Sequence, residues 1–256
     1  MRSLIVNADD FGFTRDVNQG IIEAHRNGIL TATTLMATGD AFDDAVRIAN
    51  ETPSLDIGCH LVLVGAPFPA TIARLIQAIA LRRIRVYDEL AMQVRRILDA
   101  GITPTHLDTH KHTHLLPQVL DAVTRISEEF KIPWIRKPFD FRSQPGGIGW
   151  KNKLMQLRRG GFARAFARHG CRSTDWFTGF RITGVYNTTT LVELVRALPE
   201  GSTELMCHPG ILGPELQKSR TRLKQSREEE LRALTSQEVR RAIEEADVRL
   251  VRYRDL

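Results

Sequence analysis

Cysteine and long apolar runs are scarce in this chain. Its 256 residues include three cysteines, Cys59, Cys171 and Cys207, too few for the disulfide framework of a small secreted domain. No run of about 18 apolar residues is present, so the sequence predicts no transmembrane helix. The chain begins directly in a strand-like segment, without the regions of a signal peptide, and we therefore expect a protein of the reducing cytoplasm.

Acidic residues are missing from one long interval, 141–174. The cations of this interval are Arg142, Lys151, Lys153, Arg158, Arg159, Arg164, Arg168 and Arg172. The rest of the chain is slightly acidic, so the net charge of +6 belongs to this insert-like segment. Such a run is either a solvated face that caps the fold or a surface for an anionic partner. Interleaved aromatic residues, among them Trp150, Phe162 and Phe166, keep the second explanation open.

A glycine-rich phosphate-binding loop is missing as well, because the glycines at 146–149 follow no clear strand. The chain does contain alternating strand and helix patterns from end to end, in a composition that is 42% apolar and 26% charged. This alternation predicts an α/β fold with a parallel sheet, open or closed into a barrel, and we expect one domain over 1–256. We expect strands at about 3–9, 30–37, 55–60, 103–110, 134–137, 180–186, 203–207 and 248–253.

Two adjacent aspartates close the first of these strands, where Leu4–Gly12 reads Leu-Ile-Val-Asn-Ala-Asp-Asp-Phe-Gly. Neighbouring side chains in a strand point to opposite faces, so Asp9 and Asp10 cannot do the same job within it. At the strand's end, where the chain turns, one carboxylate can hold a metal ion while the other takes a proton. A plain strand-ending turn would use the same residues, since Asp and Gly both favour turns.

Histidines gather at the ends of three further strand-like segments, 55–60, 105–114 and 204–210. These segments hold six of the eight histidines: His60, His106, His110, His112, His114 and His208. Asp and His side chains clustered at strand ends are typical of a metal site with an acid or a base beside it. Both open sheets and barrels of this class place their ligand sites at the carboxyl ends of the strands.

Four motifs in this order resemble the YdjC-like carbohydrate deacetylases, which include chito-oligosaccharide deacetylases and hopanoid-biosynthesis-associated deacetylases. The motifs are Asn7-Ala-Asp-Asp-Phe-Gly12, Gly58-Cys-His-Leu61, His106-Leu-Asp-Thr-His110 and Glu204-Leu-Met-Cys-His-Pro209. The resemblance spans almost the whole chain. It implies a distorted (β/α) TIM-like barrel, one divalent metal ion, either Mg²⁺ or Zn²⁺, and removal of the N-acetyl group from an N-acetylglucosamine-type sugar.

The resemblance also implies roles for individual residues. The metal ligands would be Asp10, His60 and His110, the catalytic base Asp9, the acid His208, and the residue that orients Asp9 or touches substrate Arg136. One carboxylate and two imidazoles leave coordination positions open for water and a substrate oxygen, which agrees with this chemistry. An amide nitrogen is a poor leaving group until it is protonated, so an acid is needed as well as a base.

Several neighbouring residues stay open. His106 and His110 stand four apart, and more distant polysaccharide deacetylases use a His-x-x-x-His pair as ligands, which would leave His60 out. We prefer His60 with His110, and expect His106 to support a ligand from behind or to pack in the core. His112 is expected to line the pocket or the surface, and Asp108 either supports a histidine or is purely structural.

Other functions are compatible with the same residues. Another metal-assisted hydrolase on this barrel, such as a phosphodiesterase or an amidohydrolase, is one alternative, although a two-metal site would usually need more carboxylates at the strand ends. A non-catalytic binder of nucleic acid or anionic surfaces through 141–174 would leave the Asp and His cluster without a purpose. An apolar stripe of Leu154, Leu157, Phe162 and Phe166 between cations is compatible with two roles. It could contact an anionic membrane peripherally, which suits a lipid-linked amino sugar, or it could cap the barrel with its cations facing water. The sequence leaves the oligomeric state open, a homo-oligomer included.

Overall fold

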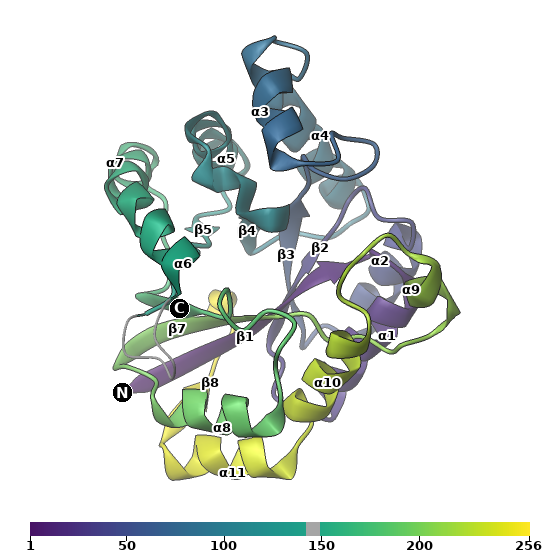
Figure 1. The fold of residues 1–256 in the computed structure, drawn as a ribbon, viewed down its shortest axis with the longest axis vertical. Helices are drawn as coiled ribbons and strands as arrows, with labels where there is room; N and C mark the ends of the chain where they lie inside the picture. The colour runs from purple at the N-terminus through teal and green to yellow at the C-terminus, as the bar shows by residue number, and fades with distance from the viewer. Residues whose placement is uncertain (142–148) are drawn as a thin grey trace.

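A curled parallel sheet of eight strands forms the centre of the computed structural model, which describes residues 1–141 and 149–256 (Figure 1). The strands are β1 (Arg2–Phe11), β2 (Ala32–Leu35), β3 (Asp56–Leu61), β4 (His106–Thr109), β5 (Trp134–Ile135), β6 (Trp176–Thr178), β7 (Gly201–Cys207) and β8 (Val248–Leu250). Their order across the sheet is β5-β4-β3-β2-β1-β7-β6, with β8 paired to β1. Every pairing between these strands is parallel, so their carboxyl ends meet at one edge.

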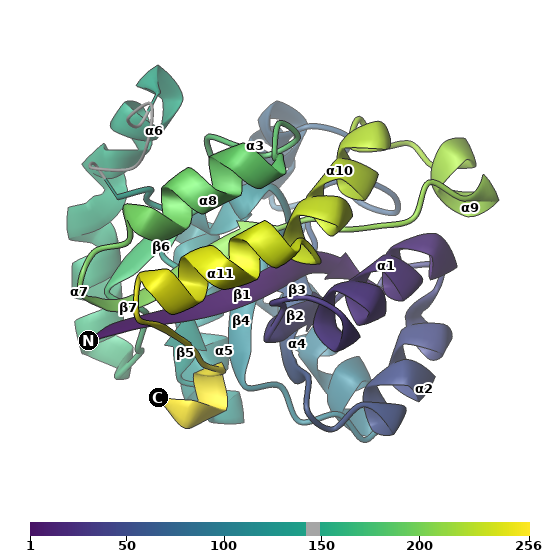
Figure 2. The ribbon, with the colours of Figure 1, turned by 90° about the horizontal axis from the view of Figure 1, so that it is seen from below.

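Helices connect and cover the strands. They are α1 (Arg15–Arg26), α2 (Phe42–Glu51), α3 (Ile72–Ala80), α4 (Val86–Asp99), α5 (Pro117–Phe130), α6 (Trp150–Met155), α7 (Arg159–His169), α8 (Thr188–Arg196), α9 (Pro214–Lys218), α10 (Gln225–Leu234) and α11 (Gln237–Glu245). Short 3₁₀ turns occupy His110–Leu115, Gln156–Arg158 and Tyr253–Asp255. Seen from below, α8 and α11 lie side by side across the sheet (Figure 2). In the described ranges, no helix is both long enough and apolar enough to cross a membrane.

Two isolated parallel bridges bring the ends of the curled sheet together. Trp134 in β5 pairs with Arg172, and Asp140 pairs with Phe177 in β6. The segment after β5 therefore runs alongside the segment that enters β6, and the sheet approaches a closed ring. The predicted α/β fold with a distorted barrel of parallel strands is confirmed.

Side chains of β1 point alternately to the two faces of the sheet. They contribute to two apolar clusters and, at the carboxyl end of the strand, to the polar site. Leu4 and Val6 pack into the main core, whereas Ile5 joins a smaller cluster on the other face with Tyr253. Successive side chains alternate along a strand, so Asn7 and Asp9 share the face of Ile5. The alternation that places Leu4 and Val6 in the main core therefore also places the Asp9 carboxylate on the opposite face, at the carboxyl end of the sheet.

Two local predictions are wrong. The strand expected at 180–186 is absent, and β6 lies earlier, because the Asp140 carboxylate accepts hydrogen bonds from the backbone N–H groups of Phe180 and Arg181 and holds that segment in a turn. Thr235 and Glu238 have the spacing of a capping box, which predicts Thr235 as the cap of the helix that follows, but the observed cap is shifted by one position. Ser236 caps α11 instead, and its side chain accepts a hydrogen bond from the backbone N–H of Glu238.

The basic segment is divided between core and surface. Phe162 and Phe166 are buried, whereas Leu154 and Leu157 are 61% and 77% exposed, so the predicted stripe does not lie on one face. The expectations about Arg142, the glycines at 146 and 147, and the Lys151 side chain fall outside the described residues. The segment therefore packs onto the barrel through α7 and exposes apolar side chains at α6.

Candidate active site

A distorted backbone at the end of β1 lets both aspartates face the same region. The register between β1 and β2 shifts between Ala8 and Phe11, as in a β-bulge. Within this irregularity Asp10 has φ 70°, in the left-handed region that Asp tolerates better than most residues. The strand's alternation is broken there, so Asp10 turns to the carboxyl edge together with Asp9. A left-handed residue at such a place is typical of a functional site.

Asp10, His60 and His110 form a compact cluster of potential metal ligands. Asp10 Oδ1 lies 3.4 Å from His60 Nε2 and 3.3 Å from His110 Nδ1, and the two ring nitrogens are 3.2 Å apart. His60 comes from β3, and His110 follows β4 at a kink where Lys111 has φ 54°. One carboxylate oxygen and two imidazole nitrogens converging in this way could hold a single divalent ion.

His60 is held from behind by Asp108. Its Nδ1 lies 2.6 Å from Asp108 Oδ1, and Thr34 Oγ1 donates to Asp108 Oδ2 at 3.2 Å. Burial lowers the pKa of His60, but the carboxylates of Asp108, Asp10 and Asp9 outweigh burial and raise it to about 10. Without an ion, the cluster therefore draws a proton onto His60. A buried site whose carboxylates stabilise a positive charge in this way is suited to binding a cation.

Arg136 organises the other side of the same cluster. Its buried guanidinium donates to both oxygens of Asp9 at 2.7 and 2.8 Å and, through Nε, to Glu204 Oε1 at 2.7 Å. It also forms an ion pair with Asp108, with Nη1 2.6 Å from Oδ2. Burial alone would raise the pKa of Asp9, but the charge of Arg136 lowers it far below its usual value. Burial raises the pKa of Glu204 to about 7 despite the same cation. Asp9 is thus an ionised carboxylate that Arg136 holds in a fixed orientation.

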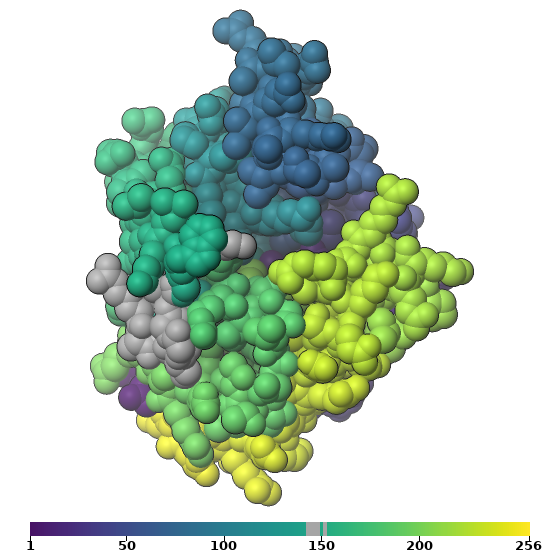
Figure 3. Space-filling model, in the orientation of Figure 1, coloured from purple at the N-terminus to yellow at the C-terminus, as the bar shows by residue number. Residues whose placement is uncertain are grey.

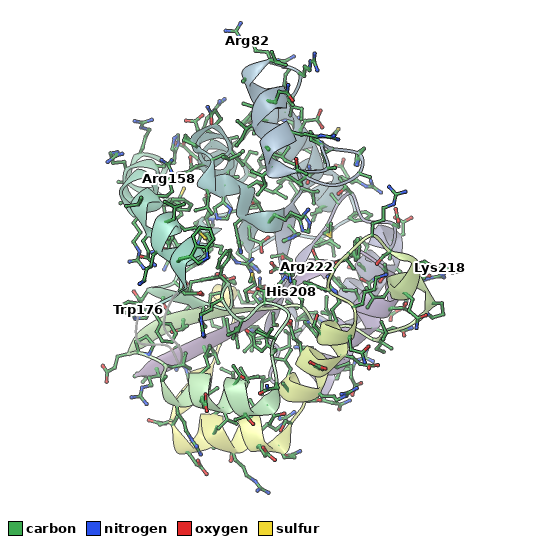
Figure 4. All side chains as sticks on the ribbon, in the orientation of Figure 1. Arg82, Arg158, Trp176, His208, Lys218 and Arg222 are labelled. Atoms are coloured by element: carbon green, nitrogen blue, oxygen red, sulfur yellow. The ribbon has the colours of Figure 1, made fainter. Side chains whose placement is uncertain are left out.

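His208 follows β7 and lies across from Asp9. Its Nε2 is 3.8 Å from Asp9 Oδ2, and burial lowers the pKa of His208 to about 4. Its backbone N–H donates to Glu230 Oε2 at 2.5 Å. Figure 4 shows His208 in the middle of the face that is viewed in Figure 1. In the space-filling view that face is hollowed between the helices, and purple N-terminal residues lie at the floor of the hollow (Figure 3).

The remaining predicted residues lie nearby but outside the ligand cluster. The His106 ring stacks on Tyr253 at 3.9 Å between centroids, and its Nε2 bonds Asn7 Oδ1 at 3.1 Å, so His106 packs in the core. The buried His112 ring packs against Phe177 and Phe180. His112 Nδ1 has no partner among the described residues.

Sequence reasoning missed two charged residues of this site, Arg227 and Glu230 on α10. Arg227 Nη2 donates to Asp10 Oδ2 at 2.5 Å, and Glu230 receives the backbone N–H of His208. Both are buried, with exposures of 1% and 0%. The sequence pattern of Glu228–Leu234 predicts a helix and nothing more. The available signal was their spacing, because residues three apart on a helix share a face with buried neighbours such as Ala233 and Leu234.

Comparison with known proteins identifies similar chains. A family model described as YdjC-like protein matches residues 3–245. A carbohydrate deacetylase of Brevibacillus brevis is 33% identical over 265 residues, covering 99% of each chain. One from Geobacillus stearothermophilus is 33% identical over 270 residues, covering 99% of this chain and 98% of the relative.

Among solved structures, a crystal structure from Enterococcus faecalis, described as a candidate cellobiose-phosphate cleavage protein, has a TM-score of 0.78 at 28% identity. The match covers 99% of this chain and 98% of that one. The resemblance that the four motifs indicated is therefore confirmed over nearly the whole length. The chain belongs to the YdjC-like protein family.

Proposed function

We propose that this protein is a carbohydrate N-deacetylase that uses one divalent metal ion. The observation that carries the proposal is the convergence of Asp10, His60 and His110 beside Asp9, an ionised carboxylate that is free of that ligand set. The curated relatives from Brevibacillus brevis and Geobacillus stearothermophilus, which are named carbohydrate deacetylases, support the reaction class.

The ligand set fits a single ion. Asp10 Oδ1, His60 Nε2 and His110 Nδ1 would hold it, and three protein ligands leave positions open. A bound ion would lower the pKa of a water molecule and polarise the acetamide carbonyl. Two histidines and a carboxylate suit Zn²⁺, and the family also makes Mg²⁺ a candidate, so we propose one of these two ions.

The chain's own residues would move the proton. Asp9, oriented by Arg136, accepts a proton from the attacking water. Asp9 Oδ2 and His208 Nε2 lie 3.8 Å apart, so the proton would pass from Asp9 to His208 through one bridging water molecule. His208 then protonates the departing amine nitrogen as its bond to the acetyl carbon breaks. The imidazole is neutral again at the end of the cycle.

The acetylated sugar is proposed to be of the N-acetylglucosamine type, as an oligosaccharide or as a lipid-linked amino sugar. Exposed Trp150, Leu154 and Leu157 on and beside α6 support contact with an anionic membrane. Part of the basic segment has an internal role instead, because Arg158 Nε donates to the carbonyl of Leu115.

Vesicle co-sedimentation separates the two substrate forms. Binding to anionic but not neutral vesicles is expected for a lipid-linked substrate, and Leu154→Ser with Leu157→Ser should weaken it on the order of tenfold through lost apolar burial. Met92→Ser on α4 is the matched control, because Met92 is also exposed, at 57%. Absence of binding at low salt would favour a soluble oligosaccharide.

The surroundings of a second group of potential metal ligands argue against a two-metal hydrolase. Asp9, His60 and Asp108 also lie close enough to hold an ion, but the Arg136 guanidinium forms ion pairs with both carboxylates there. A second cation at this place would meet a fixed positive charge. Two metal ions per chain in the active protein would contradict our assignment.

Release of acetate from N-acetylated chito-oligosaccharides tests the proposal directly. The protein is stripped with a chelator and then loaded with Zn²⁺ or Mg²⁺ before the assay. We expect activity to be lost on stripping and restored by one equivalent of ion. Full activity of the stripped protein would contradict metal dependence, and no acetate release from any acetylated amino sugar would contradict the reaction class.

A further inference from the structure

Helix α10 places two buried charged side chains against opposite sides of the candidate site. Arg227 and Glu230 stand three residues apart and so share one face of the helix. The helix is itself packed against α1 and α8, which fixes its position. Neither residue belongs to the motifs at the strand ends, and burying two charges is costly unless each has a defined partner.

Arg227 is aimed at Asp10. Its Nη2 donates to Asp10 Oδ2, while Nε donates to the carbonyl of Leu223 at 3.2 Å. A Cβ at Gly210 would come within 3.1 Å of Arg227 Cδ, so the glycine leaves the room this side chain needs. Since Arg227 takes Oδ2, Asp10 is left with Oδ1 facing His60 and His110.

Glu230 is aimed at His208. Its Oε2 accepts the backbone N–H of His208, and its Oε1 accepts the backbone N–H of Gly184 at 3.4 Å. The same Oε2 lies 4.0 Å from His208 Nδ1. That ring nitrogen is buried and has no hydrogen-bond partner in the part of the chain that the structure describes. A small rotation of the imidazole would let Nδ1–H donate to the carboxylate.

We propose that α10 carries two positioning residues for the deacetylation reaction: Arg227 fixes Asp10 for one-oxygen ligation, and Glu230 fixes His208 for proton transfer. This inference rests on the proposed function. When His208 holds the proton that is to be transferred, both ring nitrogens carry hydrogen. Nδ1–H then donates to Glu230, and Nε2–H is directed toward the leaving nitrogen. Nε2 loses its proton to the amine, while the bond at Nδ1 is kept.

The Arg227 half is tested on metal binding, without turnover. Zn²⁺ is titrated calorimetrically into the stripped wild-type protein, Arg227→Lys, and the matched control Arg232→Lys, whose side chain lies on the exposed face of α10. Lysine keeps the positive charge opposite Asp10, so the variant is expected to fold. It lacks the planar guanidinium group that fixes the orientation of the carboxylate. We expect Arg227→Lys to bind Zn²⁺ about 10–100-fold more weakly, as is typical when the support of a ligand is removed. Affinity equal to that of the control would overturn this role.

The Glu230 half is tested by the choice of leaving group. Glu230→Gln keeps an oxygen to accept the His208 N–H and removes the charge, and Glu229→Gln on the exposed face is its control. We expect kcat on an acetamide sugar to fall about 10–100-fold with KM nearly unchanged. Hydrolysis of 4-nitrophenyl acetate should fall much less, because its leaving group needs no proton.

Equal losses on both substrates would show that Glu230 merely holds the fold, and no loss on either would overturn its role. Melting temperatures of the variants are measured alongside to verify that each is folded. A wild-type protein that neither binds Zn²⁺ nor releases acetate would instead contradict the proposed function, which separates that failure from a failure of the two assignments on α10.

Discussion

His60 and His208 are both buried histidines of the same site, yet their chemistry is opposite. On the metal side, three carboxylates raise the pKa of His60 to about 10, with Asp108 only 2.6 Å from Nδ1. On the acid side, burial lowers the pKa of His208 to about 4, and the nearest carboxylate oxygen to its Nδ1 is 4.0 Å away. Burial alone therefore does not set the state of these rings. The distance to a carboxylate decides which one binds a cation and which one moves a proton.

The largest expected effect comes from removing the carboxylate that lies between the two sides. Asp9→Asn should lower kcat about 10²–10⁴-fold, because it removes the base, while metal content stays at one ion per chain. Acetate release and metal analysis on the same sample measure both quantities. An emptied metal site in this variant would mean that Asp9 and Asp10 exchange roles.

The second test acts on the acid side alone. His208→Ala should slow cleavage of an acetamide by about 10²-fold or more, since the amine then leaves without a proton. Hydrolysis of an activated acetyl ester should be slowed less, and Zn²⁺ affinity should stay unchanged because His208 lies outside the ligand cluster. If His208→Ala lowered the affinity for Zn²⁺ as much as it lowers kcat, His60 and His208 would not have separate roles.

The third test acts on the metal side and depends on pH. Because His60 holds a proton below a pKa of about 10, metal binding must release it. Raising the pH from 7 toward 10 lowers the free-energy cost of removing the proton from His60. The apparent affinity for the metal ion should therefore rise about tenfold per pH unit over that range. Calorimetry in two buffers of different ionisation enthalpy gives the number of protons released.

Asp108→Asn sharpens the same test. It removes the nearest charge that raises the pKa of His60, so fewer protons should be released and affinity should fall about 10–100-fold. Proton release as large as in the wild type would show that Asp108 is only structural.

The smallest expected effect is that of Thr34→Val. The variant removes the hydroxyl that donates to Asp108 Oδ2 at 3.2 Å, a bond whose loss costs about 0.5–1.5 kcal/mol. Metal affinity should therefore fall roughly 2–10-fold with no change in the ratio of amide to ester hydrolysis. A changed ratio would mean that the two sides of the site are coupled more tightly than their separate partners indicate.

The sequence predicted much of this arrangement because its signals are local. Alternating apolar runs gave the parallel strands, and Asp9, Asp10, His60, His110 and His208 stand directly at their carboxyl ends. The left-handed conformation of Asp10 and the contacts of Asp108 needed the structure, because they depend on strands being brought side by side.

Arg227 and Glu230 escaped prediction for a different reason. A charged residue on a helix is ordinarily solvated, and nothing in its immediate neighbours shows that the helix turns this face toward the barrel. The strand expected at 180–186 failed likewise, since the Asp140 carboxylate that holds this segment in a turn lies 40 residues earlier. Long-range partners, which one sequence does not display, decided both cases.

Anomalous diffraction from crystals of the zinc-loaded protein tests the central claim most directly. The account predicts one peak per chain, within coordination distance of Asp10 Oδ1, His60 Nε2 and His110 Nδ1, with Asp9 bound to Arg136 and free of the ion. An ion held by His106 and His110 without His60, or a second ion between Asp9 and Asp108, would contradict it.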